Sequence, residues 1–221
     1  MAGPSFSAII LDFDGVILES VDVKTEAFRS LFSHLPDRVE EIVSYHRDNT
    51  GLSRFEKFRY IYEHILGKEL SDQEFRGLTE RYHALVFEGV IAARYVDGAG
   101  EFLSRFYRSV PLFVVSATPE DELKEIIRQR SMDGFFRDIF GSPRKKSDCI
   151  LEILERQGLE PGQALFVGDA LNDYDAALQV GIPFAGRVRP GEVDRFTGRR
   201  QVVVVVQDLT GLARFLEGRV C

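Results

Sequence analysis

Two aspartates, Asp12 and Asp14, follow the short apolar run "AIIL" at residues 8–11 and stand directly before Gly15. An apolar run bounded by a turn predicts a central strand that is buried on both faces. Because side chains alternate along a strand, both carboxylates would point the same way. Two close carboxylates repel, so one must be protonated or both must meet a cation. A solvated Asp–Gly turn is the plainer interpretation, and a site that requires negative charge is the other.

A second polar group follows another apolar run, "LFVV" at residues 112–115. Ser116 and Thr118 come next, and Pro119 is expected to open a helix. Such a strand-to-helix turn offers backbone N–H groups and hydroxyls to an anion, as phosphate sites do. Ser116 and Thr118 are therefore candidates for binding a phosphorylated substrate, although ordinary helix capping explains the turn equally well.

A third group follows the run "ALFV", where Asp169 is succeeded four residues later by Asp173. We expect Asp169 to leave its strand at the same sheet edge as Asp12. Helix capping explains one of these acids, but not several that converge. Clustered carboxylates without His or Cys suit Mg²⁺, which takes one or two carboxylates together with waters and a phosphate oxygen.

Basic residues occur in two places where they could meet this acidic group. The segment "GSPRKKSD" places Arg144, Lys145 and Lys146 between a predicted strand and a helix. A solvated loop accounts for two of them, and one lysine that reaches the acids would neutralise a bound phosphate as a point charge. The segment "GLSRFEKF" offers Arg54 and Lys57 as substrate-binding residues, or as charges that only solvate the outer face of a helix.

Strand-like and helical patterns alternate over most of the chain. The strand-like runs are residues 7–13, 110–117, 138–142, 164–170, 182–186 and 201–207. Helical patterns occupy 119–132, 147–158 and 171–181, and the last two end on glycines. This alternation predicts an α/β fold with a doubly wound parallel sheet.

Residues 18–94 differ, because they contain amphipathic helical patterns and no strand-like run. The apolar stripes are Phe28, Leu31, Phe32 and Leu35; Phe55, Phe58, Ile61, Tyr62 and Ile65; and Phe75, Leu78, Tyr82 and Leu85. Ser71 with Glu74 is a predicted capping box, and Asp37 with Glu40 is expected to cap a shorter helix. Ligands bind at the carboxyl ends of parallel strands, where this insert begins, so we expect 18–94 to form a helical cap over a core of 1–17 and 95–221.

Composition limits the possible partners and location. The 221 residues are 44% hydrophobic and 29% charged, as in ordinary globular proteins. A net charge of −7 argues against non-specific nucleic-acid binding. No apolar run approaches the ~18 residues of a membrane span, and the N-terminus is too short and uncharged for a signal peptide, so a cytoplasmic location is expected. The two cysteines, Cys149 and Cys221, provide no disulfide framework, and no pattern indicates an oligomeric state.

Taken in chain order, these segments resemble the haloacid dehalogenase-like superfamily. The resemblance rests on "DFDG", "VVSATP", the lysine loop and "VGDALND", each at the end of a predicted strand. It covers the whole chain, because the helical insert falls where the β-phosphoglucomutase and phosphoglycolate phosphatase branch carries its cap. Two positions depart from the family pattern. Ser147 replaces the usual proline, so Lys145 competes with Lys146, and Glu19 stands where many relatives have Asp.

The resemblance implies a role for each group. Asp12 would be the nucleophile that forms an aspartyl phosphate, and Asp14 would protonate the leaving oxygen and then activate water. Ser116 and Lys146 would hold the phosphoryl group. Mg²⁺ would be bound by Asp12, Asp169 and the backbone carbonyl of Asp14, with Asp173 in support. In the same branch, a basic residue of the cap segment, here Arg54, faces the active site.

These residues favour a Mg²⁺-dependent phosphatase that acts on a small phosphorylated metabolite such as a sugar phosphate. A phosphomutase, which returns the phosphoryl group to the sugar, is the nearest alternative. A catalytically silent phosphate-binding module is the alternative from another class. The intact pair of Asp12 and Asp14 weighs against the silent module, and the second aspartate also argues against the dehalogenase branch.

Overall fold

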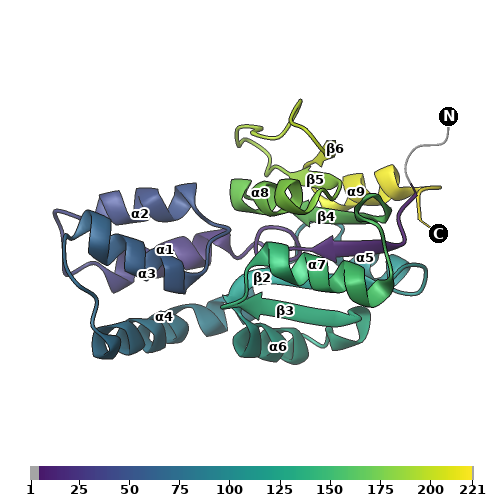
Figure 1. Ribbon diagram of the computed structural model, residues 1–221. Coiled ribbons are helices and arrows are strands. Elements are labelled where there is room, and N and C mark those ends of the chain that lie inside the picture. The colour runs from purple at the N-terminus through teal and green to yellow at the C-terminus, as the bar shows by residue number, and fades with distance from the viewer. Residues whose placement is uncertain (1–4, 221) are drawn as a thin grey trace.

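Figure 1 shows the computed structural model of the chain, which describes residues 5–220. It consists of an α/β core and a group of helices that lies beside the core. The strands of the core run toward this helical group, so their carboxyl ends face it. Cys221 lies outside the described residues.

The core contains a six-stranded sheet of order β3-β2-β1-β4-β5-β6 among the described residues. Its strands are β1 (Ala8–Leu11), β2 (Leu112–Pro119), β3 (Asp138–Ser142), β4 (Ala164–Gly168), β5 (Phe184–Arg187) and β6 (Val202–Val206). All neighbouring pairs are parallel, which confirms the predicted α/β doubly wound fold. Strand β2 runs on through Pro119, so the helix expected to open at this proline begins one residue later, at Glu120.

The position of β1 explains why its end carries the chemistry. It pairs with β2 on one side and with β4 on the other, and all four of its residues are buried. The chain winds outward from β1 in both directions, which makes the crevice between β1 and β4 a topological switch point. The Asp12 N–H donates to the carbonyl of Val167 over 2.9 Å, so the ladder continues to the first aspartate.

Helices cover both faces of the sheet, as the burial of alternate strand residues requires. Ile9 and Leu11 pack in the cluster of α5 (Ala99–Phe106), α6 (Glu120–Gln129) and α9 (Leu209–Leu216). Ala8 and Ile10 pack on the other face with α7 (Lys146–Gln157) and α8 (Leu171–Val180). Two short 3-10 turns, Asp133–Phe135 and Pro161–Gln163, precede β3 and β4. As predicted, glycines with positive φ end α7 and α8.

The helical insert comprises α1 (Val21–Leu31), α2 (Val39–Asp48), α3 (Arg54–Tyr60), which continues as a π turn (Ile61–Ile65), and α4 (Asp72–Ala92). Phe28, Phe58 and Tyr82 form its aromatic centre, with ring centroids 4.8–5.9 Å apart. The prediction that Leu85 belongs to a buried apolar stripe is wrong, because this residue is 42% exposed. The buried stripe of α4 has a four-residue spacing from Leu78 and Tyr82, which places Val86 rather than Leu85 inside.

Side-chain caps begin two of these helices. The predicted capping box of Ser71 and Glu74 is confirmed, and Ser53 with Glu56 forms another at the start of α3. The expected cap at Asp37 is wrong, because α2 begins at Val39 without a side-chain cap. Instead, the carbonyl of Leu35 accepts the N–H groups of residues 38 and 39, so a backbone turn starts the helix.

The insert joins the core through two antiparallel connections. Leu18 and Tyr95 form an isolated bridge, and the Val96 N–H donates to the Ile17 carbonyl over 3.0 Å. We propose residues 18–94 as the cap and residues 1–17 with 95–221 as the core. The cap therefore has a narrow attachment beside the carboxyl ends of the strands.

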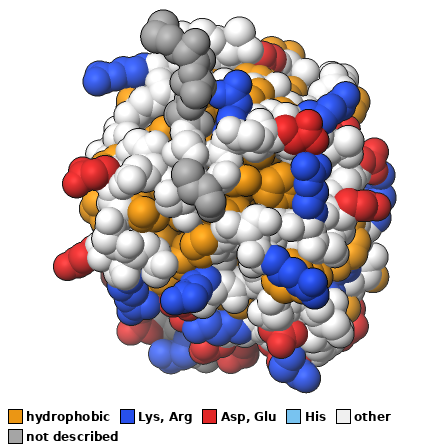
Figure 2. Space-filling model, turned by 90° about the vertical axis from the view of Figure 1, so that its right-hand side faces the viewer, with side chains coloured by type: hydrophobic (Ala, Val, Ile, Leu, Met, Phe, Trp, Pro, Cys, Tyr) orange, Lys and Arg blue, Asp and Glu red, His pale blue; other side chains and the backbone are white. Residues whose placement is uncertain are grey.

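The face turned away from the cap is shown in Figure 2, where hydrophobic side chains lie among basic and acidic ones. Among residues 5–220, none of the helices combines the length and the apolar character that a bilayer crossing requires.

Candidate active site

Lys146 lies between two buried aspartates at the carboxyl edge of the sheet. Its Nζ is 3.0 Å from Asp12 Oδ2 and 2.5 Å from Asp173 Oδ1. It is the first residue of α7, whereas its competitor Lys145 is the exposed residue before that helix. Of the two lysines, only Lys146 forms an ion pair with these acids within the described chain. Burial alone would lower the pKa of Lys146, but the carboxylates of Asp12 and Asp173 raise it above the ordinary value of a lysine.

Asp173 is fixed by the first turn of α8 rather than by solvent. Its Oδ2 accepts the N–H groups of Asp169 over 3.2 Å and Ala170 over 3.0 Å, and the residue is fully buried. A Cβ on Gly168 would lie 2.4 Å from the Cβ of Asp173, so the glycine makes room for this side chain. Asp173 thus orients both Lys146 and the loop that carries Asp169.

Three carboxylates form a group that could hold a cation. One oxygen each from Asp12, Asp169 and Asp173 lies within 4.8 Å of the others. Gly15, at φ +76°, permits this approach, because a Cβ there would lie 2.0 Å from Asp169 Oδ2. An all-oxygen donor set of this kind fits Mg²⁺. The Asp14 side chain is not part of this group.

The protonation of these acids reflects an excess of negative charge. Burial raises the pKa of Asp12 to about 7, with Asp173 and Asp14 adding to the rise and Lys146 opposing it. Burial, Asp173 and Asp12 also raise the pKa of Asp169 well above its ordinary value. One lysine therefore does not balance the cluster, and a divalent cation would favour the ionised form of both acids.

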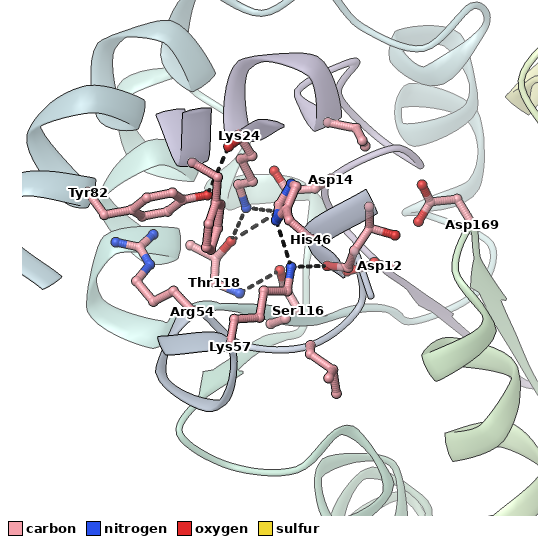
Figure 3. Close-up of a pocket in the computed structure, with 15 residues that line it drawn as sticks. Asp12, Asp14, Lys24, His46, Arg54, Lys57, Tyr82, Ser116, Thr118 and Asp169 are labelled. Carbon is pink, nitrogen blue, oxygen red and sulfur yellow. Dashed lines mark hydrogen bonds and ion pairs between the residues drawn. The ribbon is translucent and has the colours of Figure 1, made fainter. Parts of the chain in front are cut away.

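Asp14 lies in a different environment from Asp12, two residues away. It accepts a hydrogen bond from Ser20 Oγ over 2.6 Å. It also accepts one from Thr118 Oγ1 over 3.0 Å and forms an ion pair with Lys24 (Figure 3). Burial would raise the pKa of Asp14, but Lys24 and the two hydroxyls lower it below its usual value. Asp14 is thus surrounded by donors while Asp12 faces other acids.

Lys24 is a site residue that the sequence analysis missed. It lies in α1 of the cap and donates to Thr118 Oγ1 over 2.7 Å, besides its ion pair with Asp14. The available signal was its place in the first helix after the aspartate pair, but helical periodicity alone does not distinguish it from a surface lysine. Ser116, within the second half of β2, is also buried, and its Oγ accepts the N–H of Thr118 over 3.1 Å.

The cap contributes a wall to the same pocket, and both predicted basic residues belong to it (Figure 3). The interpretation that Arg54 and Lys57 solvate an outer helix face is wrong, because both are buried. Lys57 Nζ is 3.2 Å from His46 Nδ1 and 3.4 Å from the Thr50 carbonyl. His46, another residue missed from sequence, stacks on Phe28 with centroids 4.3 Å apart. Burial and the charge of Lys57 lower the pKa of His46 to about 2, so its ring is neutral.

Arg54 is engaged by the core rather than left free. Its guanidinium contacts both carboxylate oxygens of Glu122 in α6, at 2.9 and 2.5 Å, and lies over the ring of Tyr82 at 4.6 Å. Both partners of this ion pair are nearly fully buried. This bidentate ion pair therefore connects α3 of the cap to α6 of the core.

Glu19 lies where the chain passes from the core into the cap, before α1. It pairs with Arg187 and, over 3.1 Å, with Arg189. Arg187 also donates to the carbonyl of Gly15 over 3.2 Å. Through these contacts, the end of β5 supports the turn that carries the two catalytic candidates.

This arrangement agrees with the comparison to known proteins. The chain matches the haloacid dehalogenase-like hydrolase family over residues 9–187 and therefore belongs to that family. The resemblance inferred from "DFDG" and the later motifs is thus confirmed.

Its relatives include phosphoglycolate phosphatases. Phosphoglycolate phosphatase 1 of Pseudomonas aeruginosa is 27% identical over 79% of this chain and 66% of its own length. The phosphoglycolate phosphatase of Pseudomonas putida is 29% identical over 48% of this chain and 40% of its own length. The chain thus spans less than two thirds of these two relatives.

Solved structures share the fold over nearly the whole chain. A predicted phosphoglycolate phosphatase from Haemophilus somnus has a TM-score of 0.74 at 19% identity, covering 95% of this chain and 97% of that one. The HAD-hydrolase YfnB from Bacillus subtilis, solved bound to magnesium, has a TM-score of 0.71 at 17% identity, covering 97% and 100%. At these identities the likeness establishes the fold, including the helical cap.

The Arg54–Glu122 pair generates a stability prediction. Glu122→Gln leaves a buried guanidinium without its counter-charge, so the free energy of unfolding should fall by about 3–5 kcal/mol. The double variant Arg54→Met/Glu122→Gln should recover part of this loss, because no unpaired charge remains. Urea unfolding measures both. The exposed pair of Arg38 and Glu41 is the control, and Glu41→Gln should cost less than about 1 kcal/mol.

A second prediction concerns pH. The pKa of Asp12 is about 7 in the folded protein against an ordinary 3.8, so its stabilising contribution is present below about pH 4 and is lost as pH rises to about 7. In EDTA, Asp12→Asn should reduce this decline, whereas the exposed Asp175→Asn should not. Mg²⁺ at about 100 times its dissociation constant should add about 2.7 kcal/mol to wild type. Identical pH profiles for wild type and Asp12→Asn in EDTA would contradict the assignment.

Proposed function

We propose that this protein is a Mg²⁺-dependent phosphatase that hydrolyses a small phosphate monoester through an aspartyl phosphate. The observation that carries the proposal is that the two aspartates after β1 have different charged neighbours. Asp12 faces Lys146 and the acidic cluster, whereas Asp14 faces Lys24, Ser20 and Thr118. Two carboxylates in opposed environments suit a nucleophile and a separate acid–base group.

Asp12 is the proposed nucleophile. Its carboxylate attacks phosphorus, the bond from phosphorus to the ester oxygen breaks, and an aspartyl phosphate forms. Lys146, 3.0 Å from Asp12 Oδ2, is placed to neutralise the charge of the transferring group. Ser116, which lines the same pocket, supplies a hydroxyl donor for a phosphoryl oxygen.

Asp14 is the proposed acid and base. A bound phosphate places negative charge beside this carboxyl, which raises its pKa and allows it to carry a proton. It gives that proton to the leaving oxygen, then accepts one from the water that attacks the aspartyl phosphate. Lys24 and Thr118 hold Asp14 in place for both transfers and contribute donors to the pocket.

Mg²⁺ is the cation that fits the acidic cluster. Asp12 and Asp169 would hold it, with the Asp14 carbonyl contributing and Asp173 supporting, and the excess negative charge of the cluster supports this assignment. When bound, the ion would stabilise negative charge on the transferring phosphoryl group. The magnesium bound to the similarly folded YfnB is consistent with this choice.

The substrate is proposed to be a small phosphorylated metabolite, either a sugar phosphate or a compound of the phosphoglycolate type. The cap lines the pocket with Phe28 and Tyr82, which are buried, and with Leu52, which is half-buried, and a concave pocket with such a lining suits a small ligand. The two relatives named above are phosphoglycolate phosphatases, which supports the small-molecule class. In this role Arg54 and Lys57 are the substrate-facing residues of the cap, and Arg54 would exchange its partner Glu122 to contact a substrate.

Asp12→Asn tests the nucleophile. The substitution keeps the shape of the side chain but removes the attacking charge, so phosphate release should fall by roughly 10⁴-fold or more. Phosphate release from p-nitrophenyl phosphate and thermal melting should be measured on the same sample. Near-wild-type turnover by a folded Asp12→Asn protein would exclude the mechanism.

Metal exchange tests the cofactor. EDTA should abolish turnover, Mg²⁺ should restore it, and Ca²⁺ should inhibit it, because Ca²⁺ takes more oxygen ligands in looser geometry and would engage both oxygens of Asp12. The measurement is initial rate against metal concentration after chelation. Full activity in excess EDTA would show that the carboxylate cluster is not a required metal site.

A further inference from the structure

Arg187 is a buried arginine at the end of β5 that contacts the turn after Asp14 at two points. Its Nη1 donates to the Gly15 carbonyl over 3.2 Å. Its Nη1 and Nη2 also donate to the two carboxylate oxygens of Glu19, over 3.3 and 2.5 Å. The residue is only 4% exposed. The turn of residues 15–19 is therefore bound to the core at its first residue and at its last.

These two points of contact adjoin the groups that determine where Asp14 lies. The peptide that carries the Asp14 carbonyl also carries the Gly15 N–H, which donates to the Leu18 carbonyl over 2.7 Å. At the other end of the turn, the residue after Glu19 is Ser20, whose Oγ donates to Asp14 Oδ1 over 2.6 Å. A shift at the first point would move the carbonyl of Asp14, and a shift at the second would move its carboxylate.

Arg187 is itself held by rigid parts of the core. All four residues of β5 are buried, and the Nε of Arg187 donates to the carbonyl of Gln207, after β6, over 2.9 Å. Strand β4 lies between β1 and β5, so the side chain reaches across the end of β4 to the turn that follows β1. A guanidinium donates in a planar fork, which fixes the direction of its partners as well as their distance.

The charge of Arg187 also acts on the acidic cluster. Burial, Asp173 and Asp12 raise the pKa of Asp169. The charges of Lys146 and Arg187 oppose that rise. Arg187 thus lies within electrostatic reach of one proposed metal ligand, Asp169, while it holds the turn that begins at another, the Asp14 carbonyl.

We propose that Arg187 is a positioning residue of the active site, which holds Gly15 and Glu19 so that the carbonyl and the carboxyl of Asp14 are correctly placed. The inference rests on the proposed phosphatase function and goes beyond it, because Arg187 does not line the catalytic pocket and acts only through the turn. Groups that orient metal ligands from outside the site typically change metal affinity or rate 10- to 100-fold when they are removed. The loss of Arg187 should therefore lower kcat and the affinity for Mg²⁺.

Two substitutions of Arg187 test this role in the full-length protein. Arg187→Met removes the donors and the charge, whereas Arg187→Lys keeps the charge without the planar fork. With p-nitrophenyl phosphate and saturating Mg²⁺, kcat should fall by about 10- to 100-fold in both, while KM changes by less than about 3-fold. Calorimetric titration with Mg²⁺ in the absence of substrate should show a Kd raised by about 10-fold. Thermal melting shows which variants are folded.

Arg189→Met is the matched control. Arg189 pairs with the same carboxylate of Glu19 over 3.1 Å, but within residues 5–220 it donates to none of the backbone carbonyls of the turn. Its substitution should change kcat and the Kd of Mg²⁺ by less than about 3-fold. Losses as large as those of Arg187→Met would show that neutralising Glu19, rather than holding the turn, is what matters, and would overturn the proposal.

Glu19→Asp provides a test that does not depend on the folding of an Arg187 variant. It keeps the charge of residue 19 but shortens the side chain by one methylene, which withdraws the carboxylate from Arg187. We expect kcat to fall by about 10-fold with KM nearly unchanged, because small displacements of reacting groups are costly. If neither Arg187 variant folds, this variant decides, and a wild-type kcat overturns the positioning role.

The remaining outcomes separate the two proposals. Wild-type kcat and Mg²⁺ affinity in folded Arg187→Met or Arg187→Lys would overturn the positioning role and leave the phosphatase intact. A raised KM with an unchanged kcat would also overturn it, because Arg187 would then act on substrate binding. If wild type releases no phosphate from p-nitrophenyl phosphate in Mg²⁺, the phosphatase proposal fails, and the Mg²⁺ titrations of wild type and Arg187→Met still test the placement of the Asp14 carbonyl.

Discussion

The repulsion between buried carboxylates at one edge of the sheet is the constraint on which the rest of the site depends. Asp12, Asp169 and Asp173 bring three acids within a few ångströms, and Lys146 offsets only part of their charge. Such a group of buried acids is tolerated only where protonation or a bound cation reduces its negative charge. The position of β1 between β2 and β4 creates the crowding, because it aligns the ends of three strands.

The same crowding gives neighbouring aspartates different chemistry. Asp12 shares its surroundings with other acids, whereas Asp14 is turned toward Lys24 and two hydroxyls. Lys24 belongs to the cap and Asp14 to the core, so the surroundings of Asp14, the proposed acid–base group, come from both parts of the molecule. The cap is thus more than a cover: it supplies the cation that sets the charge of Asp14, just as Arg54 reaches back to Glu122.

Local patterns predicted the strands, the helical insert and the acids at the strand ends, because each depends on neighbouring residues in the chain. The charge partners could not be predicted in this way. Lys24, His46 and Glu122 look like surface residues of amphipathic helices. Only the packing of the cap on the core brings Lys24 and His46 to the pocket and Glu122 to Arg54. The rival interpretation of Lys57 as a solvating charge failed for the same reason, since its burial depends on α2 and the loop at Thr50. At Asp37 a backbone turn took the place of the expected side-chain cap.

Gly15 shows how space, rather than a functional group, can govern such a site. Its positive φ turns the chain after the aspartate pair, and the missing side chain is the space that the Asp169 carboxylate occupies. Even a methyl group would strain the turn and displace that carboxylate. In a survey of random substitutions, position 15 would therefore show the same intolerance as Asp12 and Asp14, the proposed catalytic residues. At this site, intolerance to substitution alone would therefore not distinguish a residue that only leaves room for its neighbours from one that takes part in the reaction.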